Sequence, residues 1–572
     1  MVLGEGSGRE RFDRYLTYDE LVGELERLAD SFPALVQMES AGKSYQNRDI
    51  WALTITNRET GPPEDKPALY LDGNIHAGEV TGSMLCLYAA RYLVEKYGSC
   101  PDVTDLVDSR TFYMIPRVNP DGAEKYLTTP HSLRSSVRPY PSGQEEYPPG
   151  LHPEDMNGDG LILQMRLRDD HLGEWKTHHQ DDRLMVPRAP DETEGPFYRL
   201  LPEGRFKDDP LSLTARRQPL GPARTRWGLD LNRNFPAEWS SEVRGSGPYP
   251  LSEPETLTQV DYISGRSNIG VVLAFHTTGG VVFRPPSTRP DHEMDQSDLW
   301  LLETLGRRGE EITGYPCVSS YGPKWSGTLD DWAYEQGGMI SYTPELWNMA
   351  QRAGVRVKRT LTERPDPEEE IREGLQLLAW NDRELAGEGF VRWQEFDHPQ
   401  LGPVELGGWI LKTVLQNPPP SFLAAECHKN TRLVLSMARS LPQLAFDRLQ
   451  ADQLAPGVWH VQCQVSNRGF LSTNITGQAL AKKLLQADRF EIDLDDGVKL
   501  AMGQRRADVP HLEGYSAGQR PSWSLPRAAR SSATAEWTVV SEKRPAGQVR
   551  VSFVSQRGGR ITGTVDLEDC DS

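Results

Sequence analysis

The sequence predicts an α/β protein: a three-layer α/β/α domain with a mixed, mainly parallel sheet, followed by an all-β, sandwich-like domain. Through the first part of the chain, short apolar runs alternate with helix-like segments, as in sheets covered by helices on both faces. Beyond residue 440 the apolar residues instead alternate with period two between Gly, Pro and Asn turns. With 572 residues, 37% of them hydrophobic, the chain is long enough for more than one packed core. We therefore expect domains over residues 1–440 and 441–572.

The elements of the first domain follow in order. Leu21, Leu25 and Leu28 lie at helical spacing in a segment that stops at Pro33. Extended runs at 36–40 and 50–56 precede a buried strand at 67–74 and a helix over 80–98. Further strands are predicted at 111–120, 268–276 and 338–346, with helices over 329–336 and 419–442.

Residues 139–228 do not fit this alternation. They are polar and Pro-rich, with almost no helical or strand period, so we expect a long loop insertion that walls a site. In the second domain, strands are predicted at 458–467, 535–542, 547–556 and 559–567. Its role stays open between a structural buttress and the binding of a glycan or protein.

Charge and cysteine content exclude several classes of function. Lys and Arg number 63 against 82 Asp and Glu, giving a net charge of −19, which disfavours nucleic acid and anionic membranes as partners. No run of 18 apolar residues and no apolar N-terminal stretch occur, so we expect neither a membrane span nor a signal peptide. A cytoplasmic location follows, with secretion open if a leader has been trimmed from the sequence. The six cysteines are scattered without a CxxC pair, which favours free thiols over a cysteine zinc site. The oligomeric state stays open.

Polar side chains gather where predicted strands end. His76 and Glu79 follow one strand with three-residue spacing, and His276 ends another. Chemistry in open α/β sheets collects at the carboxyl ends of strands. Imidazole and carboxylate are zinc ligands, and three of them leave a position for water. We therefore predict one zinc ion per chain at His76, Glu79 and His276.

Five motifs in this order carry a family resemblance. HAGE (76–79), NPDG (119–122), DLNRNF (230–235), FH (275–276) and YTPEL (342–346) resemble those of the zinc metallocarboxypeptidases, the carboxypeptidase A/B family, over about residues 15–350. The resemblance implies the same three zinc ligands. It implies that Glu345 is the general base, and that Asp230 orients a zinc histidine.

The same resemblance implies three residues that contact substrate. Arg134 stands fifteen residues after Asn119, the family's spacing for the arginine that polarises the scissile carbonyl, and it competes with Arg117 and Arg138. Asn232 and Arg233 match the pair that grips the terminal carboxylate. Physical chemistry supports these roles, because a planar guanidinium suits a carboxylate and positive charge suits the developing oxyanion.

The chain also departs from the family pattern. The tyrosine that closes over substrate falls at Pro323 by an ungapped count, and at Tyr321 only if the loop has gained residues. The position at the floor of the pocket for the substrate's C-terminal side chain is Asp330 by an ungapped count, which favours a basic residue. A shift by one residue places Leu329 there, which favours an apolar one.

The insertion itself contains a candidate calcium loop. Asp155, Asn157 and Asp159 form a DxNxDG string that suits either a Ca²⁺ site or an Asx/Gly turn.

The expected function is a zinc-dependent metallocarboxypeptidase. Its expected partner is a peptide with a free C-terminal carboxylate. The alternatives are an amidase or peptidase acting on peptidoglycan stem peptides or another non-protein amide, and an inactive zinc-binding recognition module.

Overall fold

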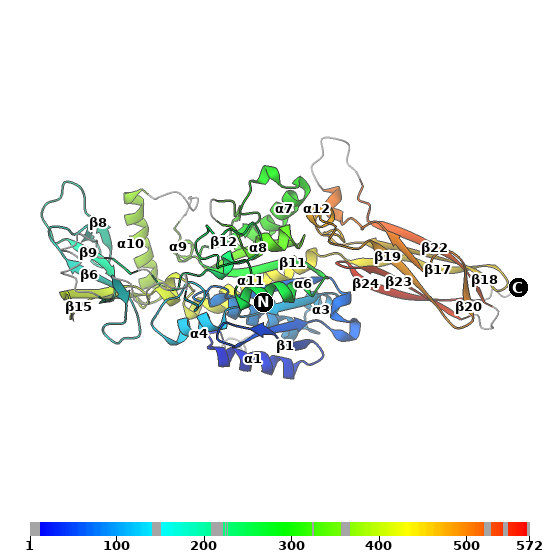
Figure 1. The fold of residues 1–572 in the computed structure, drawn as a ribbon, viewed down its shortest axis with the longest axis horizontal. Helices are drawn as coiled ribbons and strands as arrows, with labels where there is room; N and C mark the ends of the chain where they lie inside the picture. Colours follow the sequence, from blue (N-terminus) through cyan, green and yellow to red (C-terminus); the bar gives the residue numbers. More distant parts are fainter. Residues whose placement is uncertain are drawn as a thin grey trace.

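The structure, a computed structural model, describes residues 12–139, 150–207, 221–223, 225, 227–322, 325–355, 366–519, 528–541 and 547–568. The molecule is elongated, with a central α/β domain between two β-rich units (Figure 1). Among the described residues, no helix is both long and apolar enough to cross a bilayer. Five of the six cysteines are free thiols, as predicted, and Cys570 lies outside the described residues.

The central sheet has eight strands in the order β1-β2-β4-β3-β11-β14-β12-β13. Strands β4, β3, β11 and β14 run parallel in the middle, while β1, β2 and β12 add antiparallel pairs. The mixed, mainly parallel sheet is therefore confirmed. The strand bounds are β1 (Val36–Lys43), β2 (Asp49–Ile55), β3 (Ala68–Gly73), β4 (Thr111–Ile115), β11 (Ile269–Thr277), β12 (Val281–Arg284), β13 (Cys317–Ser319) and β14 (Ile340–Leu346).

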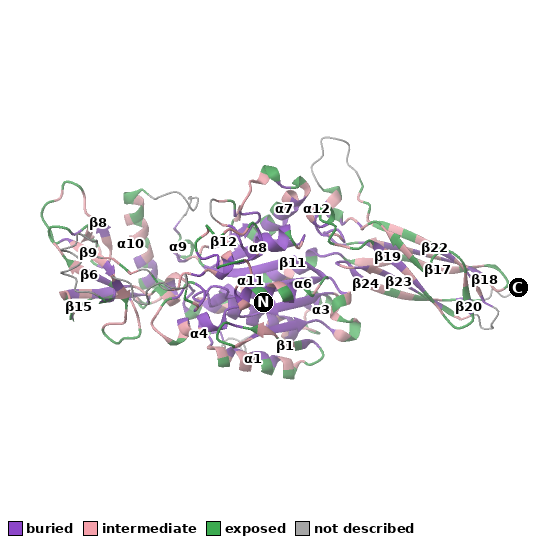
Figure 2. Ribbon diagram, viewed as in Figure 1, coloured by how far each residue is buried: buried purple, intermediate pink, exposed green. Residues whose placement is uncertain are grey.

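Helices cover both faces of this sheet. Along β11, Val271, Leu273 and Phe275 pack into one core with helices α1, α2, α3, α7 and α11, while Val272 and Ala274 pack against α6 and α8 on the other face. All nine residues of β11 are buried, which explains its unbroken apolar sequence (Figure 2). The helix bounds are α1 (Tyr18–Ser31), α2 (Thr81–Lys96), α3 (Pro101–Ser109), α4 (Pro120–Thr128), α6 (Pro254–Ser264), α7 (Gln296–Thr313), α8 (Leu329–Glu335), α9 (Met349–Arg352), α10 (Pro367–Glu384), α11 (Pro420–Ser440) and α12 (Gly477–Ala481).

The C-terminal unit consists of two four-stranded sheets, β17-β18-β22-β20 and β21-β19-β23-β24. Trp459, Phe490, Trp537 and Phe553 belong to the core that both sheets share. Every second residue of β18 is buried, as the period-two pattern predicted. The bounds are β17 (Leu444–Ala455), β18 (Val458–Asn467), β19 (Asp488–Leu494), β20 (Val498–Met502), β21 (Arg506–Val509), β22 (Ser532–Ser541), β23 (Gln548–Ser555) and β24 (Gly559–Asp566).

The insertion 139–228 is more ordered than a loop, which corrects the sequence prediction. Its described residues include six strands: β5 (Leu151–Pro153), β6 (Gln164–Arg168), β7 (Trp175–Thr177), β8 (Met185–Pro187), β9 (Tyr198–Pro202) and β10 (Gly204–Phe206). Four of them join the hairpin β15 (Phe390–His398) and β16 (Gly402–Trp409) in a sheet ordered β15-β16-β6-β9-β7-β8, which we call the insertion sheet. Strands of three to five residues are too short to show a period, and the pairing hairpin lies far along the chain.

Candidate metal centre

Three predicted ligands converge at the carboxyl edge of the central sheet. His76 and Glu79 lie in the loop between β3 and α2, and His276 lies near the end of β11. Since β3 and β11 are neighbouring parallel strands, their ends bring the three side chains together. All three are buried.

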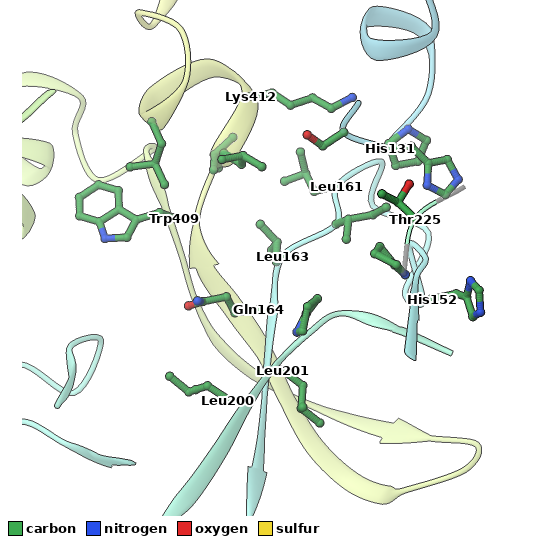
Figure 3. Close-up of a pocket in the computed structure, with 18 of the residues that line it drawn as sticks. His131, His152, Leu161, Leu163, Gln164, Leu200, Leu201, Thr225, Trp409 and Lys412 are labelled. Carbon is green, nitrogen blue, oxygen red and sulfur yellow. The ribbon is translucent and has the colours of Figure 1, made fainter. Parts of the chain in front are cut away.

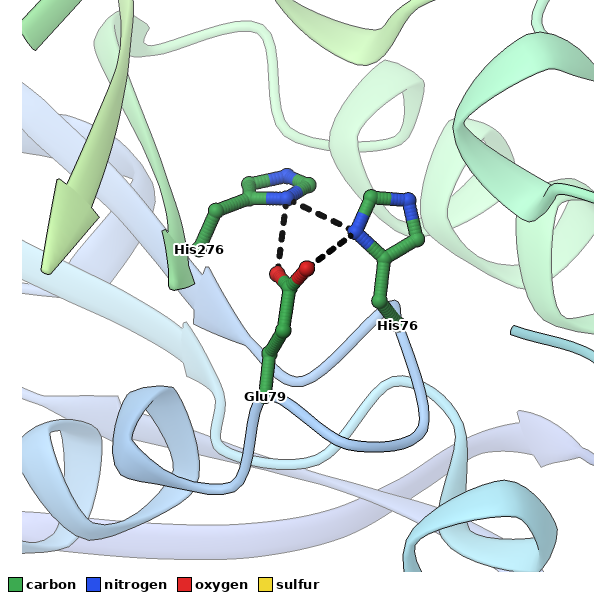
Figure 4. Close-up of side chains that lie close together, drawn as sticks. All are labelled: His76, Glu79 and His276. Atoms are coloured by element: carbon green, nitrogen blue, oxygen red, sulfur yellow. Dashed lines mark hydrogen bonds and ion pairs between the residues drawn. The ribbon is translucent and has the colours of Figure 1, made fainter. Parts of the chain in front are cut away.

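The ligand atoms face one point between them (Figure 4). His76 Nδ1 lies 2.9 Å from Glu79 Oε1, His276 Nδ1 lies 3.0 Å from Glu79 Oε2, and the two Nδ1 atoms lie 3.0 Å apart. Two imidazole nitrogens in contact cannot both carry a proton toward each other. A divalent cation would use both lone pairs and the carboxylate at once. Tetrahedral zinc ligands, each about 2.0–2.1 Å from the ion, lie roughly 3.3 Å from one another, so this donor set fits zinc.

Polar neighbours hold the ligands in place. Asp230 Oδ1 lies 3.0 Å from His76 Nε2, as the predicted orienting carboxylate should. Arg134 donates to Glu79 Oε1 at 3.0 Å and to Asp230 Oδ2 at 3.4 Å. Burial opposes ionisation of Asp230, but the charges of His76 and Arg134 hold its pKa well below the usual value. Both carboxylates therefore stay ionised beside the histidines.

Glu345 lies beside this cluster. It stands opposite His276 in the parallel register of β11 and β14. Its Oε2 is buried and accepts no hydrogen bond from the described residues. Burial, together with the negative charge of Glu79, raises the pKa of Glu345 to about 8. A carboxylate so placed can take up and release a proton near neutral pH.

A small cavity of about 160 Å³ opens at the cluster. Its lining holds most of the predicted site: His76, Arg134, Asn232, Arg233, His276, Phe283, Ser287, Ser320, Trp325, Thr328, Asp330, Thr343 and Glu345. The sequence left three arginines as candidates for stabilising the oxyanion. Of these, Arg134 lines the cavity, whereas Arg138 pairs with Glu253 at 2.7 Å and Arg117 is buried against the carbonyl of Leu16.

Asn232 and Arg233 lie on a short turn of 3₁₀ helix, η4 (Leu231–Arg233), in which the side chain of Asp230 accepts the backbone N–H of Asn232. Asn232 Oδ1 accepts the backbone N–H of Leu329 at 3.0 Å, which ties this turn to α8. Gly327, with φ +74°, passes so close that a β-carbon there would lie 2.3 Å from the carbonyl oxygen of Arg233. Only glycine permits this approach.

Asp330 lines the cavity and is buried, in agreement with the ungapped count. Its neighbour Asp331 accepts the backbone N–H of Ser287 at 2.9 Å. Burial and the charge of Asp330 raise the pKa of Asp331 well above its usual value. Of the two carboxyl groups, Asp330 is the one that lines the cavity.

Tyr321 is not brought to this cavity. Its side chain is 55% exposed and does not line it. Pro323, the alternative position, lies outside the described residues. Instead, Phe283 and Trp325 contribute aromatic walls, with ring centroids 5.7 Å apart and planes at 87°. We did not predict either; the tryptophan stands in the same loop, SYGPKWSGT, that we searched for a tyrosine.

The DxNxDG string forms a turn. Asp155 accepts the backbone N–H groups of Gly158 and Gly160, at 2.8 and 2.9 Å. Asn157 Oδ1 accepts the N–H of Asp159 at 3.0 Å. These oxygens are engaged within the turn, so calcium at Asp155, Asn157 and Asp159 is not supported. In the part of the chain that the structure describes, His76, Glu79 and His276 are the group suited to hold a metal.

Comparisons with known proteins agree with this geometry. A family model described as zinc carboxypeptidase matches residues 21–158 and 202–365, more than half of the chain. A second, described as a domain of unknown function, matches residues 443–566.

Individual relatives match over stretches of different length. A zinc carboxypeptidase of Saccharothrix mutabilis subsp. capreolus is 36% identical over 115 residues, 20% of this chain and 26% of that protein. Carboxypeptidase A2 of Rattus norvegicus is 34% identical over 360 residues, 60% of this chain and 66% of the relative. The crystal structure of thrombin activatable fibrinolysis inhibitor aligns with a TM-score of 0.42 and 18% identity over 76% of each chain.

Proposed function

The chain belongs to the zinc carboxypeptidase family, and from that premise we propose that it removes the C-terminal residue of a peptide in a zinc-dependent hydrolysis. One observation carries the proposal: three buried ligands converge beside the Glu345 carboxylate, whose buried Oε2 accepts no hydrogen bond from the described residues, in a cavity that also holds two arginines. A zinc-dependent amide hydrolysis uses such groups together: a metal, a general base and positive charge for the oxyanion.

His76, Glu79 and His276 would hold the metal. When bound, zinc supplies a water of lowered pKa and polarises the substrate carbonyl. Asp230, 3.0 Å from His76 Nε2, would keep that ring oriented with Nδ1 toward the ligand cluster.

Glu345 would act as the general base. Its pKa is about 8 because it is buried and because Glu79 is negative. Positive charge at the ligand cluster would offset Glu79 and lower this pKa toward neutrality. The carboxylate would then accept a proton from water and pass it to the leaving amine.

Arg134 and the Asn232–Arg233 pair would bind two different negatively charged groups of the substrate. Arg134, already fixed by Glu79 and Asp230, would stabilise the oxyanion. Arg233 would receive the terminal carboxylate, because a guanidinium can bind it through two hydrogen bonds. Its Nη1 donates to the backbone carbonyl of Asn232 at 2.7 Å, which holds the side chain near the small cavity.

Asp330 would select the side chain of the released residue. A buried acidic side chain in the cavity favours Lys or Arg at the C-terminus. Replacing Asp330 with Asn should remove a preference for basic over apolar C-terminal residues, measured as a ratio of kcat/KM values.

The decisive experiment combines metal analysis with product analysis. The zinc-loaded protein should release C-terminal residues from a peptide library, and a chelator should stop the release. Glu345→Gln should keep one zinc per chain and lose activity about 10²–10⁴-fold. The exposed Glu311 provides a matched control, since Glu311→Gln should change neither measurement.

Full hydrolysis by Glu345→Gln with zinc bound would contradict the mechanism. A panel that also contains muropeptides separates peptide substrates from peptidoglycan stem peptides. Release from muropeptides alone would replace the proposed substrate.

A further inference from the structure

A second, larger cavity lies between the insertion sheet and the catalytic domain (Figure 3). Its volume is about 660 Å³, within the range of about 300–1,000 Å³ typical of ligand sites. Apolar side chains dominate its lining, among them Leu161, Leu163, Leu201, Trp227, Trp409 and Leu415.

This cavity is built mostly from parts of the chain that the family model does not match. Leu161–Gln164 and Leu200–Leu201 fall in the gap between residues 158 and 202, and Trp409–Leu415 lie beyond residue 365. The cavity is therefore a feature of this chain's additions to the shared domain.

The polar groups in the lining carry no negative charge. Among the described residues, none that lines the cavity is Asp or Glu, in a chain with a net charge of −19. Lys412 Nζ is held by the backbone carbonyls of Tyr126 and Thr129, each at 2.5 Å. Burial and the charges of Lys125 and Lys412 lower the pKa of His131, so its ring is neutral at pH 7. The cavity suits an apolar group and rejects a cationic one.

Three chain segments connect this cavity to the metal centre. Ser132 lines the large cavity, and Arg134, two residues on, lines the small one. Trp227 precedes Asp230 by three residues. Lys412 lies five residues before Asn417, whose Nδ2 donates to the carbonyl of Gly78, between two metal ligands, at 2.8 Å. At about 3.3–3.6 Å per residue, the first two connections span at most roughly 7 and 11 Å.

We propose that the large cavity binds an apolar side chain of the peptide substrate, about three or four residues before the scissile bond. The inference rests on the proposed function. In a carboxypeptidase only one residue follows the bond, so a second cavity beside the site can receive only residues before it. An extended peptide advances by the same 3.3–3.6 Å per residue, which sets the expected position.

The test compares peptides with identical C-terminal dipeptides. One series places Leu or Phe at the third or the fourth position before the bond, and the other places Ser there. We expect kcat/KM to rise about ten-fold or more for the apolar series, mainly through KM, because burying one such side chain is worth about 1.5–3 kcal/mol.

Two variants should abolish this preference: Leu161→Trp, which fills the cavity, and Leu411→Glu, which adds a carboxylate at a side chain already 42% exposed. Leu172→Glu is the matched control, since Leu172 is 66% exposed in the insertion and does not line the cavity. All three should cleave an N-acetylated dipeptide like the unmodified protein, which shows that they fold and that the metal centre is intact.

Equal kcat/KM for the apolar and Ser series would overturn the inference and leave the proposed function standing. The inference would also be overturned if both cavity variants kept the preference for apolar residues. Failure to cleave any peptide with zinc bound would overturn the proposed function, and the inference with it.

Discussion

The two β-rich units that flank the central domain are joined to it in opposite ways. The C-terminal unit is continuous with the main core, to which it contributes Leu471 and Ile475. Buried polar contacts complete the junction: Arg557 donates to the carbonyls of Gly337 and Gly338 at 2.5 and 2.7 Å. Asp298 of α7 accepts the backbone N–H groups of Gly477 and Gln478 at 2.7 and 2.9 Å.

The insertion sheet instead encloses the large cavity where it meets the catalytic domain. Its own core, which includes Met165, Phe206 and Leu406, is small and separate from the main one. A filled junction fixes the position of a unit, whereas a hollow one leaves room for a ligand. The difference favours a structural role for the C-terminal unit and a substrate-selecting role for the insertion.

The largest expected effect tests the filled junction against the hollow one. Leu471→Ala should lower the free energy of unfolding by about 2–5 kcal/mol, because Leu471 is fully buried in the main core and its removal leaves a cavity. Leu161→Ala should cost less than about 1 kcal/mol, since Leu161 already faces empty space. Urea unfolding of both variants measures this, and equal losses would remove the distinction.

Arg557→Met tests the polar part of the filled junction. The carbonyl of Gly337 would lose its donor and that of Gly338 would keep only Thr476 Oγ1, so we expect a loss of about 1–3 kcal/mol in the free energy of unfolding. Arg550, exposed on β23 of the same unit, is the control, and Arg550→Met should change stability by less than about 0.5 kcal/mol. A similar small change for Arg557→Met would show that the contact does not hold the unit.

The smallest expected effect is a pH response of opposite sign at the two junctions. Burial raises the pKa of Asp298 above 3.8, so the folded state binds this proton more tightly, and stability falls as pH rises from about 4 through the folded pKa. Burial lowers the pKa of Lys412 from 10.5 to about 8, so between these values the unfolded chain holds a proton that the folded protein has lost, and stability rises with pH.

Asp298→Asn should flatten the acid trend alone and Lys412→Met the alkaline trend alone, both read from urea unfolding at a series of pH values. If the two variants changed the pH dependence of stability in the same way, the assignment of the acid trend to Asp298 and of the alkaline trend to Lys412 would be contradicted.

The sequence predicted the parts of the molecule whose signals are local. The apolar sequence of a long strand such as β11 directly indicates that the strand is buried. The positions of His76 and His276 at the ends of two strands predicted that they meet at one edge of a sheet, and those strands are neighbours. The five ordered motifs led to the ligand cluster, to Glu345 and to the arginines, all of which the structure brings to one cavity.

The remaining features depend on contacts between distant segments. Strand β6 pairs with β16, more than two hundred residues later, and neither strand's sequence reveals the other. Trp325 and Phe283 meet only because the loop before α8 folds over β12. Counting back from Glu345 gave Pro323, which lies outside the described residues, and gave the exposed Tyr321 only if the loop had gained residues, because a count cannot follow a loop that has changed length.

The contacts of Asn417 limit how far the chain can be truncated from its C-terminal end. Besides the carbonyl of Gly78, this residue engages the backbone N–H of Thr81 at 3.2 Å and its hydroxyl at 2.8 Å, at the start of α2. A fragment trimmed at residue 365, where the family match stops, would leave these groups of the ligand loop facing solvent. A catalytic piece that keeps these contacts therefore has to extend at least to Asn417, and shorter expression boundaries would remove them from the zinc-binding loop.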